Sequence, residues 1–104
     1  MALIITPTTE KKIYVQGTTI ELPQVYNRLE FVCKSNGISM EIAFSTYADY
    51  TAYTLLNSLP SDLPTRNLYV DIDPLTQTQG LQSAHDLAKA WYESLGYTVT
   101  IDLV

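Results

Sequence analysis

The dipeptide Asn36-Gly37 constrains the fold of this chain more than any other feature, because it lies between two runs in which apolar and polar residues alternate. Asn-Gly in that context is the strongest short-range signal for a two-residue β-hairpin turn, since both central positions of the turn need positive φ. The sequence therefore predicts one β-hairpin from Tyr26 to Tyr47.

The turn also predicts the register of the two strands. A two-residue loop places Ser35 opposite Ile38, and successive pairs then alternate between the two faces of the hairpin. The face expected to be buried has three further pairs: Cys33 with Met40, Phe31 with Ile42, and Leu29 with Phe44. The face expected to be polar has four cross-strand pairs: Arg28 with Ser45, Glu30 with Ala43, Val32 with Glu41, and Lys34 with Ser39.

Short β-prone segments precede the hairpin. Leu3-Ile4-Ile5 is apolar throughout and Pro7 follows it, so residues 1–8 are expected to form an N-terminal arm. This arm is either an edge strand of its own domain or a strand added to the sheet of a neighbouring copy. Two more short strands are predicted at residues 13–15 and 18–22.

The middle of the chain, residues 46–67, is irregular and rich in tyrosine, leucine and proline. Tyr50, Tyr53 and Leu56 are three residues apart, which predicts a short helical turn there. Tyr-rich loops provide large, rigid contact surfaces, so this stretch is either an interface or a cover for a sheet edge.

The last third predicts a strand, a helix and a final strand. Residues 68–73 alternate strictly, with Leu68, Val70 and Ile72 expected to face inward. The helical stripe that follows, expected to be buried, consists of Leu81, Ala84, Ala88, Trp91 and Leu95. Residues 97–104 alternate again, with one apolar row formed by Tyr97, Val99, Ile101 and Leu103.

These elements predict a single α+β domain over residues 1–104: a mostly antiparallel β-sheet of five or six strands with one C-terminal amphipathic helix inside a βαβ unit. The strands before and after the helix are expected to run parallel, adjacent to each other or one strand apart.

Charge and composition exclude several classes of function. Net charge is −5 and only 16% of residues are charged, so no direct contact with nucleic acid is expected. No apolar run approaches the roughly 18 residues of a membrane-spanning helix, so no membrane partner is expected. The low charge suits a protein that packs against others, and equally a Thr- and Tyr-rich β protein.

Residues with catalytic or metal-binding chemistry are few. His85 is the only histidine and is expected to be a packed or capping residue, while Cys33 is the only cysteine and is expected to be a buried, unreactive thiol with a raised pKa. Asp71, Asp73 and Asp102 could form a small carboxylate cluster, so Mg²⁺ or Ca²⁺ binding stays open without being predicted. No catalytic residue, cofactor or metal ligand is assigned, and the chain is not expected to be an enzyme.

The overall pattern resembles the small structural virion proteins of tailed bacteriophages. Three segments contribute to this resemblance: Met1 to Ile5, Arg28 to Cys33, and Leu81-Gln-Ser-Ala-His through to Leu103. It implies a head, connector, tail or baseplate component present in many copies, with no cofactor and no catalytic residue. It also implies synthesis in the host cytoplasm, location in the virion, and partners that are other virion proteins and copies of itself.

The expected function is therefore that of a non-enzymatic structural subunit of a multi-copy assembly. The alternative is a small acidic interaction or inhibitor domain that docks on one protein target. The residues expected at the interface are Leu3, Ile4, Ile5, Tyr47, Tyr50 and Tyr53.

Overall fold

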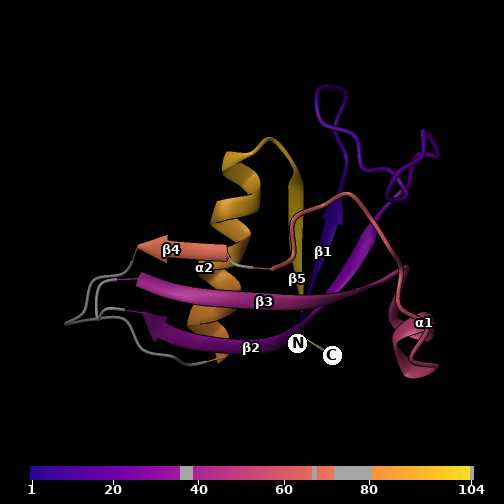
Figure 1. The fold of residues 1–104 in the computed structure, drawn as a ribbon. Coiled ribbons are helices and arrows are strands. Elements are labelled where there is room, and N and C mark those ends of the chain that lie inside the picture. The colour runs from indigo at the N-terminus through magenta and orange to yellow at the C-terminus, as the bar shows by residue number, and fades with distance from the viewer. Residues whose placement is uncertain (36–38, 67, 72–80, 104) are drawn as a thin grey trace.

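The computed structural model describes residues 1–35, 39–66, 68–71 and 81–103 (Figure 1). The Asn36-Gly37 turn, Ile72 and Asp73 lie outside the described residues. The helices are α1 (Tyr50–Thr54) and α2 (Leu81–Ser94). The strands are β1 (Ala2–Thr6), β2 (Val25–Ser35), β3 (Ser39–Tyr47), β4 (Leu68–Asp71) and β5 (Thr98–Asp102).

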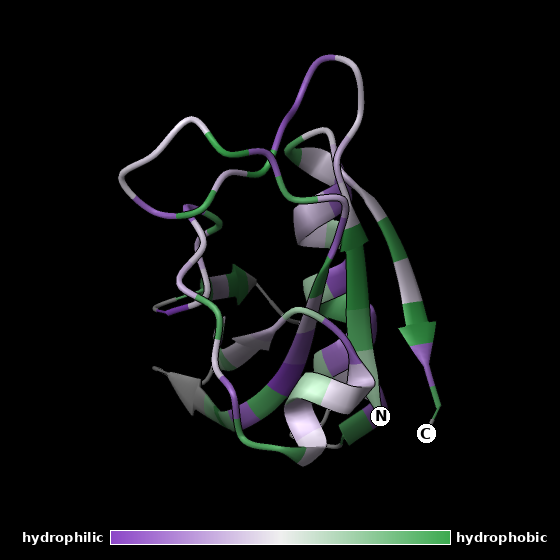
Figure 2. Cartoon of the chain, turned by 90° about the vertical axis from the view of Figure 1, so that its right-hand side faces the viewer, coloured by the Kyte–Doolittle hydropathy of each residue, from purple (hydrophilic) through white to green (hydrophobic). Residues whose placement is uncertain are grey.

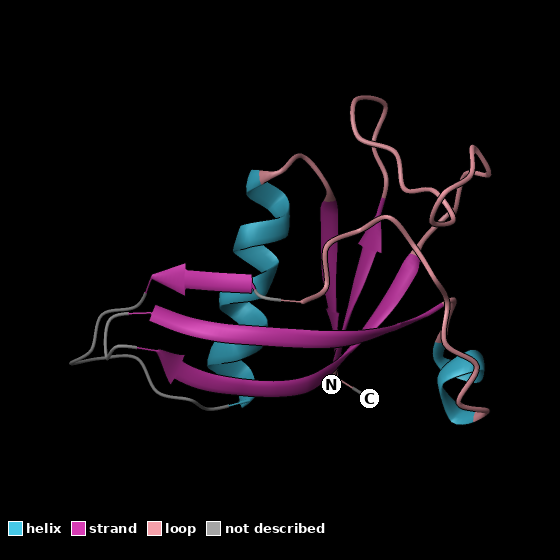
Figure 3. Ribbon diagram, in the orientation of Figure 1, coloured by secondary structure: helices cyan, strands magenta, loops and turns pink. Residues whose placement is uncertain are grey.

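The strands form one five-stranded sheet in the order β4-β3-β2-β1-β5, and every neighbouring pair is antiparallel. Helix α2 packs on one face of this sheet, behind β2, β3 and β4 in the view of Figure 3. The predicted α+β class is confirmed. Residues 13–15 and 18–22 do not form strands, and an isolated bridge between Tyr14 and Glu21 joins these two segments.

The strands on either side of α2 are not close neighbours. The pairing makes β4 and β5 point in the same direction, as predicted, but they form opposite edges of the sheet. The expectation that they lie adjacent or one strand apart is therefore wrong. The reason is that the N-terminal strand and the hairpin fill the whole interval between them.

β1 is a central strand. It pairs with β2 on one side and with β5 on the other, and its Leu3 and Ile5 side chains are fully buried in the core. Figure 2 shows β1 as an apolar segment beside β5, with both termini at the same end. Residues 2–6 are therefore neither a separable arm nor an edge strand, so both predicted placements are wrong. A run with two buried side chains is best accommodated between two other strands.

The hairpin follows the predicted register only in part. Leu29 lies opposite Phe44 and Arg28 opposite Ser45, as predicted, but the register shifts between Leu29 and Phe31. A β-bulge there leaves one extra residue, Glu30, in β2.

The bulge reverses the orientation of the next residues of β2. Val32 now pairs with Ile42 and packs against the core, while Phe31 pairs with Ala43 and is exposed. Cys33 pairs with Glu41 rather than Met40 and is exposed, so the predicted burial of Phe31 and Cys33 is wrong. The bulge allows Leu29 and Val32, three positions apart, to contact the same core.

The buried face of helix α2 overlaps the predicted stripe only in part: Ala84 and Ala88 are buried as predicted, and Trp91 is partly buried against the core. Its buried residues are Ala84, His85, Ala88 and Tyr92. Leu81 at the first turn is 53% exposed, and Leu95 just past the helix is exposed as well. The two small alanine side chains let the helix approach the sheet closely, and the large Tyr92 then fills the space beyond them.

The central position of β1 predicts a large loss of stability from truncating its core side chains. Leu3→Ala should lower the free energy of unfolding by roughly 2–5 kcal/mol, because it removes a buried side chain and leaves a cavity between the sheet and α2. Leu81→Ala is the control, since Leu81 is 53% exposed. Urea unfolding followed by circular dichroism measures both, and equal midpoints would contradict a central β1.

Candidate interaction surface

The sheet face opposite α2 is called the outer face here. Its side chains alternate along each strand with those of the core, and the register places Arg28, Ser45, Phe31, Ala43 and Tyr69 on it. Only its end near β3 is covered by a helix in the described part of the chain, and that helix is α1 (Figures 1 and 3). One face of the sheet therefore builds the core, while the other is partly accessible: Phe31 and Tyr69 are exposed on it, and Ala43 is buried.

Helix α1 is positioned by its cap and by aromatic contacts. The Asp49 carboxylate accepts a hydrogen bond of 2.8 Å from the backbone N–H of Ala52, which caps the first turn. The ring of Tyr53 then lies 5.3 Å from that of Tyr47 and 6.1 Å from that of Tyr50, measured between centroids. The three tyrosines predicted as interface residues are thus brought together.

Tyr26 and Arg28 complete this tyrosine cluster from the neighbouring strand. The Tyr26 ring is buried beneath Tyr50 and Tyr53, with centroids 6.2 Å from each. The guanidinium of Arg28 lies 4.2 Å from the Tyr53 centroid and donates a 3.3 Å hydrogen bond to the Tyr26 hydroxyl. A cation held over an aromatic face contributes about 0.5–1 kcal/mol at an exposed site, so Arg28 also fixes α1 against the sheet.

The outer face has large apolar side chains beyond the tyrosine cluster. Phe31, on the middle strand β2, is 40% exposed, and Tyr69, on the edge strand β4, is 55% exposed. The tip of α1 adds the exposed Leu55 and Leu56, the latter with a positive φ of 57°. Sequence patterning missed Phe31 because the bulge that turns it outward leaves no signal in the alternation.

Three polar groups on this face, Glu30, Ser45 and Arg66, are paired with one another. Ser45 donates a 2.9 Å hydrogen bond to the Glu30 carboxylate, and Arg66 forms an ion pair with the same group. The hydrogen bond from Ser45, followed by the contacts with Arg66, lowers the pKa of Glu30. The bulged residue is therefore held as a carboxylate with partners.

The N-terminal residues predicted at the interface divide differently. Leu3 and Ile5 point into this chain's own core and are fully buried, so a partner cannot contact them. Ile4 alternates with them, pairs with Tyr26 and is half-buried on the outer face. The described structure thus separates the six predicted interface residues into two in the core and four on or near the outer face.

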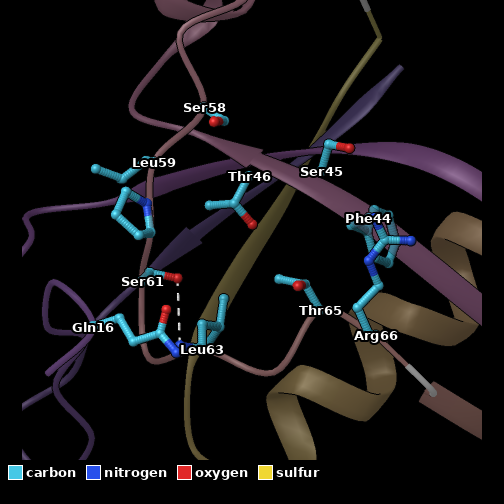
Figure 4. Close-up of a pocket in the computed structure, with 11 residues that line it drawn as sticks. Gln16, Phe44, Ser45, Thr46, Ser58, Leu59, Ser61, Leu63, Thr65 and Arg66 are labelled. Carbon is cyan, nitrogen blue, oxygen red and sulfur yellow. Dashed lines mark hydrogen bonds between the residues drawn. The ribbon is translucent and has the colours of Figure 1, made fainter.

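A pocket of about 270 Å³ lies beside β3, where the loop after α1 runs along the strand (Figure 4). Thr46 accepts a 2.8 Å hydrogen bond from the Leu59 N–H, and Phe44 donates one of 2.9 Å to the Thr65 carbonyl. The residues that line the pocket are Gln16, Phe44, Ser45, Thr46, Ser58, Leu59, Pro60, Ser61, Leu63, Thr65 and Arg66. This lining offers hydroxyl groups and one guanidinium, which already contacts Glu30.

A buried polar network lies behind the pocket and joins four segments of the chain. Thr46 donates to the Asn27 side-chain oxygen at 2.8 Å, and the Asn27 amide donates to the Tyr92 hydroxyl at 3.4 Å. Tyr92 in turn donates to the carbonyl of Pro64. Burial raises the pKa of the Tyr92 hydroxyl, so it remains protonated and can donate this bond. The network attaches the loop to β2, β3 and α2.

His85 is buried on the sheet side of α2, where its ring lies 6.1 Å from that of Phe44. Nδ1 is 2.7 Å from the Leu81 carbonyl oxygen, so this nitrogen must be the protonated donor. Nε2 is buried without a hydrogen-bond partner in the described structure. Burial lowers the pKa of His85, and the positive charge of the N-terminus adds to this effect. The neutral ring is a packed core residue, as the sequence predicted.

The described residues show no group of three or more histidines, cysteines or carboxylates close enough to bind a metal ion. Asp71 on β4 and Asp102 on β5 are at opposite edges of the sheet, with three strands between them. The carboxylate cluster suggested by the sequence is therefore not formed by these two residues, and Asp73 lies outside the described residues.

Comparison with known proteins gives no relative: no family model, curated protein or solved structure matches this chain. Within the described residues, no helix is long and apolar enough to cross a membrane.

The neutral state of His85 predicts a pH dependence of stability. The folded state lowers the pKa of His85 below its unfolded value of about 6.5, so the unfolded chain binds the proton more readily. The free energy of unfolding should be constant above pH 7 and should decrease as the pH falls from about 6.5 to 5.5, a range above the usual carboxylate pKa values.

Urea unfolding at several pH values measures this slope in the wild type and in His85→Gln. His85 is the only histidine, so the variant should lose most of the slope, whatever its absolute stability. An unchanged slope in the variant would show that His85 is not the responsible group.

Proposed function

We propose that this chain is a non-enzymatic structural subunit of a multi-copy assembly, such as the virion of a tailed bacteriophage, and that its outer face contacts neighbouring proteins in that assembly. The observation that supports this most is the exposure of Phe31 and Tyr69 on a sheet face that α2 does not cover. The resemblance to small virion proteins supports the choice of assembly.

The chemistry of the outer face fits burial against a protein. Aromatic residues are enriched in interface cores and charged residues are depleted there. Phe31, Tyr69 and Tyr50 provide aromatic surface, while only 16% of the residues in the chain are charged. A rigid sheet that presents such side chains loses little conformational entropy on binding.

Two of the charges on the outer face, Glu30 and Arg28, have contacts that lower the cost of burying them. Glu30 already has Ser45 and Arg66 as partners, and Arg28 lies over the Tyr53 ring. A charge that keeps its partner in a complex avoids most of the penalty of leaving a buried ion unpaired. A third charge, Glu41, lies between Cys33 and Tyr69 in the register, so a binding partner has to supply a polar group there.

Fractionation by size tests the proposal. In a lysate of its native source the wild-type chain should sediment with a large particle, and Phe31→Glu combined with Tyr69→Glu should remain in the small-protein fraction. Both positions are exposed, so the double variant should fold. Its urea unfolding is compared with that of the wild type, because the new carboxylate at position 69 lies opposite Glu41. Ile20→Glu is the matched control, because Ile20 is 63% exposed and lies in the loop before β2.

A double variant that enters the particle as well as the wild type would overturn the role of the outer face. A wild-type chain that is always small, and that binds one foreign protein in a fixed ratio, would overturn the structural-subunit proposal. That second result would establish the acidic interaction or inhibitor domain instead.

A further inference from the structure

Strand β5 forms one edge of the sheet. All five of its residues, Thr98–Asp102, pair with β1, and no further strand follows β5 in the sheet order. Figure 2 shows β5 at the margin of the described structure, with no element beyond it. Its outer edge therefore presents backbone N–H and C=O groups that another strand can pair with.

The edge lacks several of the features that protect such a strand. Its sequence, Thr-Val-Thr-Ile-Asp, has no lysine and no proline, and its one charge is at the last position, Asp102. The register with β1 is continuous from Thr98 to Asp102, so no bulge bends the strand away. Natural proteins use charges, prolines and bulges to prevent edge pairing, so most of this edge is open to another strand.

We propose that β5 pairs antiparallel with β5 of a second copy, about a two-fold axis at Thr100. Residues that pair across strands must point to the same face of the sheet, which restricts such an axis to a residue position rather than a point between residues. An axis at Thr100 is the choice that pairs all five residues: Thr100 with itself, Val99 with Ile101 of the second copy, and Thr98 with Asp102 of the second copy.

The strict alternation of polarity along β5 is compatible with this register, and the number of paired residues selects it over an axis at a neighbouring residue. Positions 98, 100 and 102 are polar, and positions 97, 99, 101 and 103 are apolar. The pairing therefore sets apolar side chains against apolar ones on the core face and polar against polar on the outer face. No like charges face each other, because the one acidic residue, Asp102, lies opposite a threonine.

The same register accounts for Leu103. This side chain is 76% exposed just beyond the end of β5. Continuing the pairing by one step on the same face places Leu103 opposite Tyr97 of the second copy, and Tyr97 is half-buried. The dimer would therefore cover a large apolar side chain that the isolated chain leaves in water.

This inference rests on the proposed function, in which the chain contacts copies of itself. The β5 edge is separate from the outer-face positions Phe31 and Tyr69, which are on β2 and β4. The second copy is proposed rather than a foreign strand because its register sets the exposed Leu103 against an apolar side chain, Tyr97 of the second copy, and sets Asp102 against a threonine.

Cysteine cross-linking at the axis tests the pairing and its register. In a Cys33→Ser background, Thr100→Cys brings two cysteines directly opposite each other, within the Cα separation that a disulfide can bridge. Thr98→Cys is the matched control, because it is exposed on the same strand and face but lies opposite Asp102 of the second copy. Purified protein is equilibrated in a glutathione redox buffer, and the covalent dimer is measured by non-reducing electrophoresis.

The disulfide-linked dimer of Thr100→Cys should exceed that of Thr98→Cys by about tenfold or more, since pairing raises the local thiol concentration. A mixture of Thr98→Cys with Asp102→Cys should cross-link well above either variant alone, because the heterodimers in the mixture place the two cysteines opposite each other. Equal cross-linking of the two single variants, or cross-linking of Thr100→Cys only to the extent seen in urea, would overturn the proposal.

The two proposals fail separately. If Thr100→Cys cross-links but the Phe31→Glu, Tyr69→Glu variant still enters the particle, the outer-face function is wrong and the edge pairing stands. If the outer-face variant is lost from the particle and Thr100→Cys does not cross-link, the edge pairing alone is wrong.

Discussion

The burial of Leu3 and Ile5 between two other strands is the constraint on which this fold depends. β1 is the only described strand that links the hairpin to the C-terminal strand, since it pairs with β2 on one side and β5 on the other. Without it, β5 would have no neighbour in the sheet and α2 would lose part of the surface on which Ala84, Ala88 and Tyr92 pack. The first residues of the chain thus complete a core that the rest of the sequence leaves open.

This arrangement assigns the two faces of the sheet to different tasks. The core face holds α2, the buried polar network around Tyr92 and the neutral His85. The outer face and the β5 edge have no equivalent cover among the described elements. A small domain buries only part of its accessible surface on folding. In this chain the surface left exposed on the outer face has large aromatic side chains, and the chain as a whole has few charges. Those are the properties on which the proposed role in an assembly is based.

Much of the architecture could be predicted from alternation and turn chemistry. The hairpin, α2, β4 and β5 follow from local patterns, and Tyr47, Tyr50 and Tyr53 do meet in one cluster. The errors came from effects that act over a distance. A single extra residue at Glu30 reversed Phe31 and Cys33, and alternation cannot indicate such a bulge. The place of β1 in the sheet depends on pairing partners that are twenty or more residues away in β2 and more than ninety residues away in β5, which no local pattern contains. The buried face of α2 also differs from the prediction. Tyr92 is buried and has polar partners in the core, whereas Leu81 and Leu95, which the pattern of leucines predicted to be buried, are exposed.

Native-state hydrogen exchange at the amides of β1 tests the central role of this strand most directly. If β1 is locked between β2 and β5, the amides of Leu3, Ile4 and Ile5 that hydrogen-bond to those strands should exchange only through global unfolding. Their opening free energy should then equal that of the slowest amides of β2 and should match the free energy of unfolding measured in urea. Exchange of the whole β1 segment with an opening free energy several kcal/mol lower would show a detachable arm and would contradict this account.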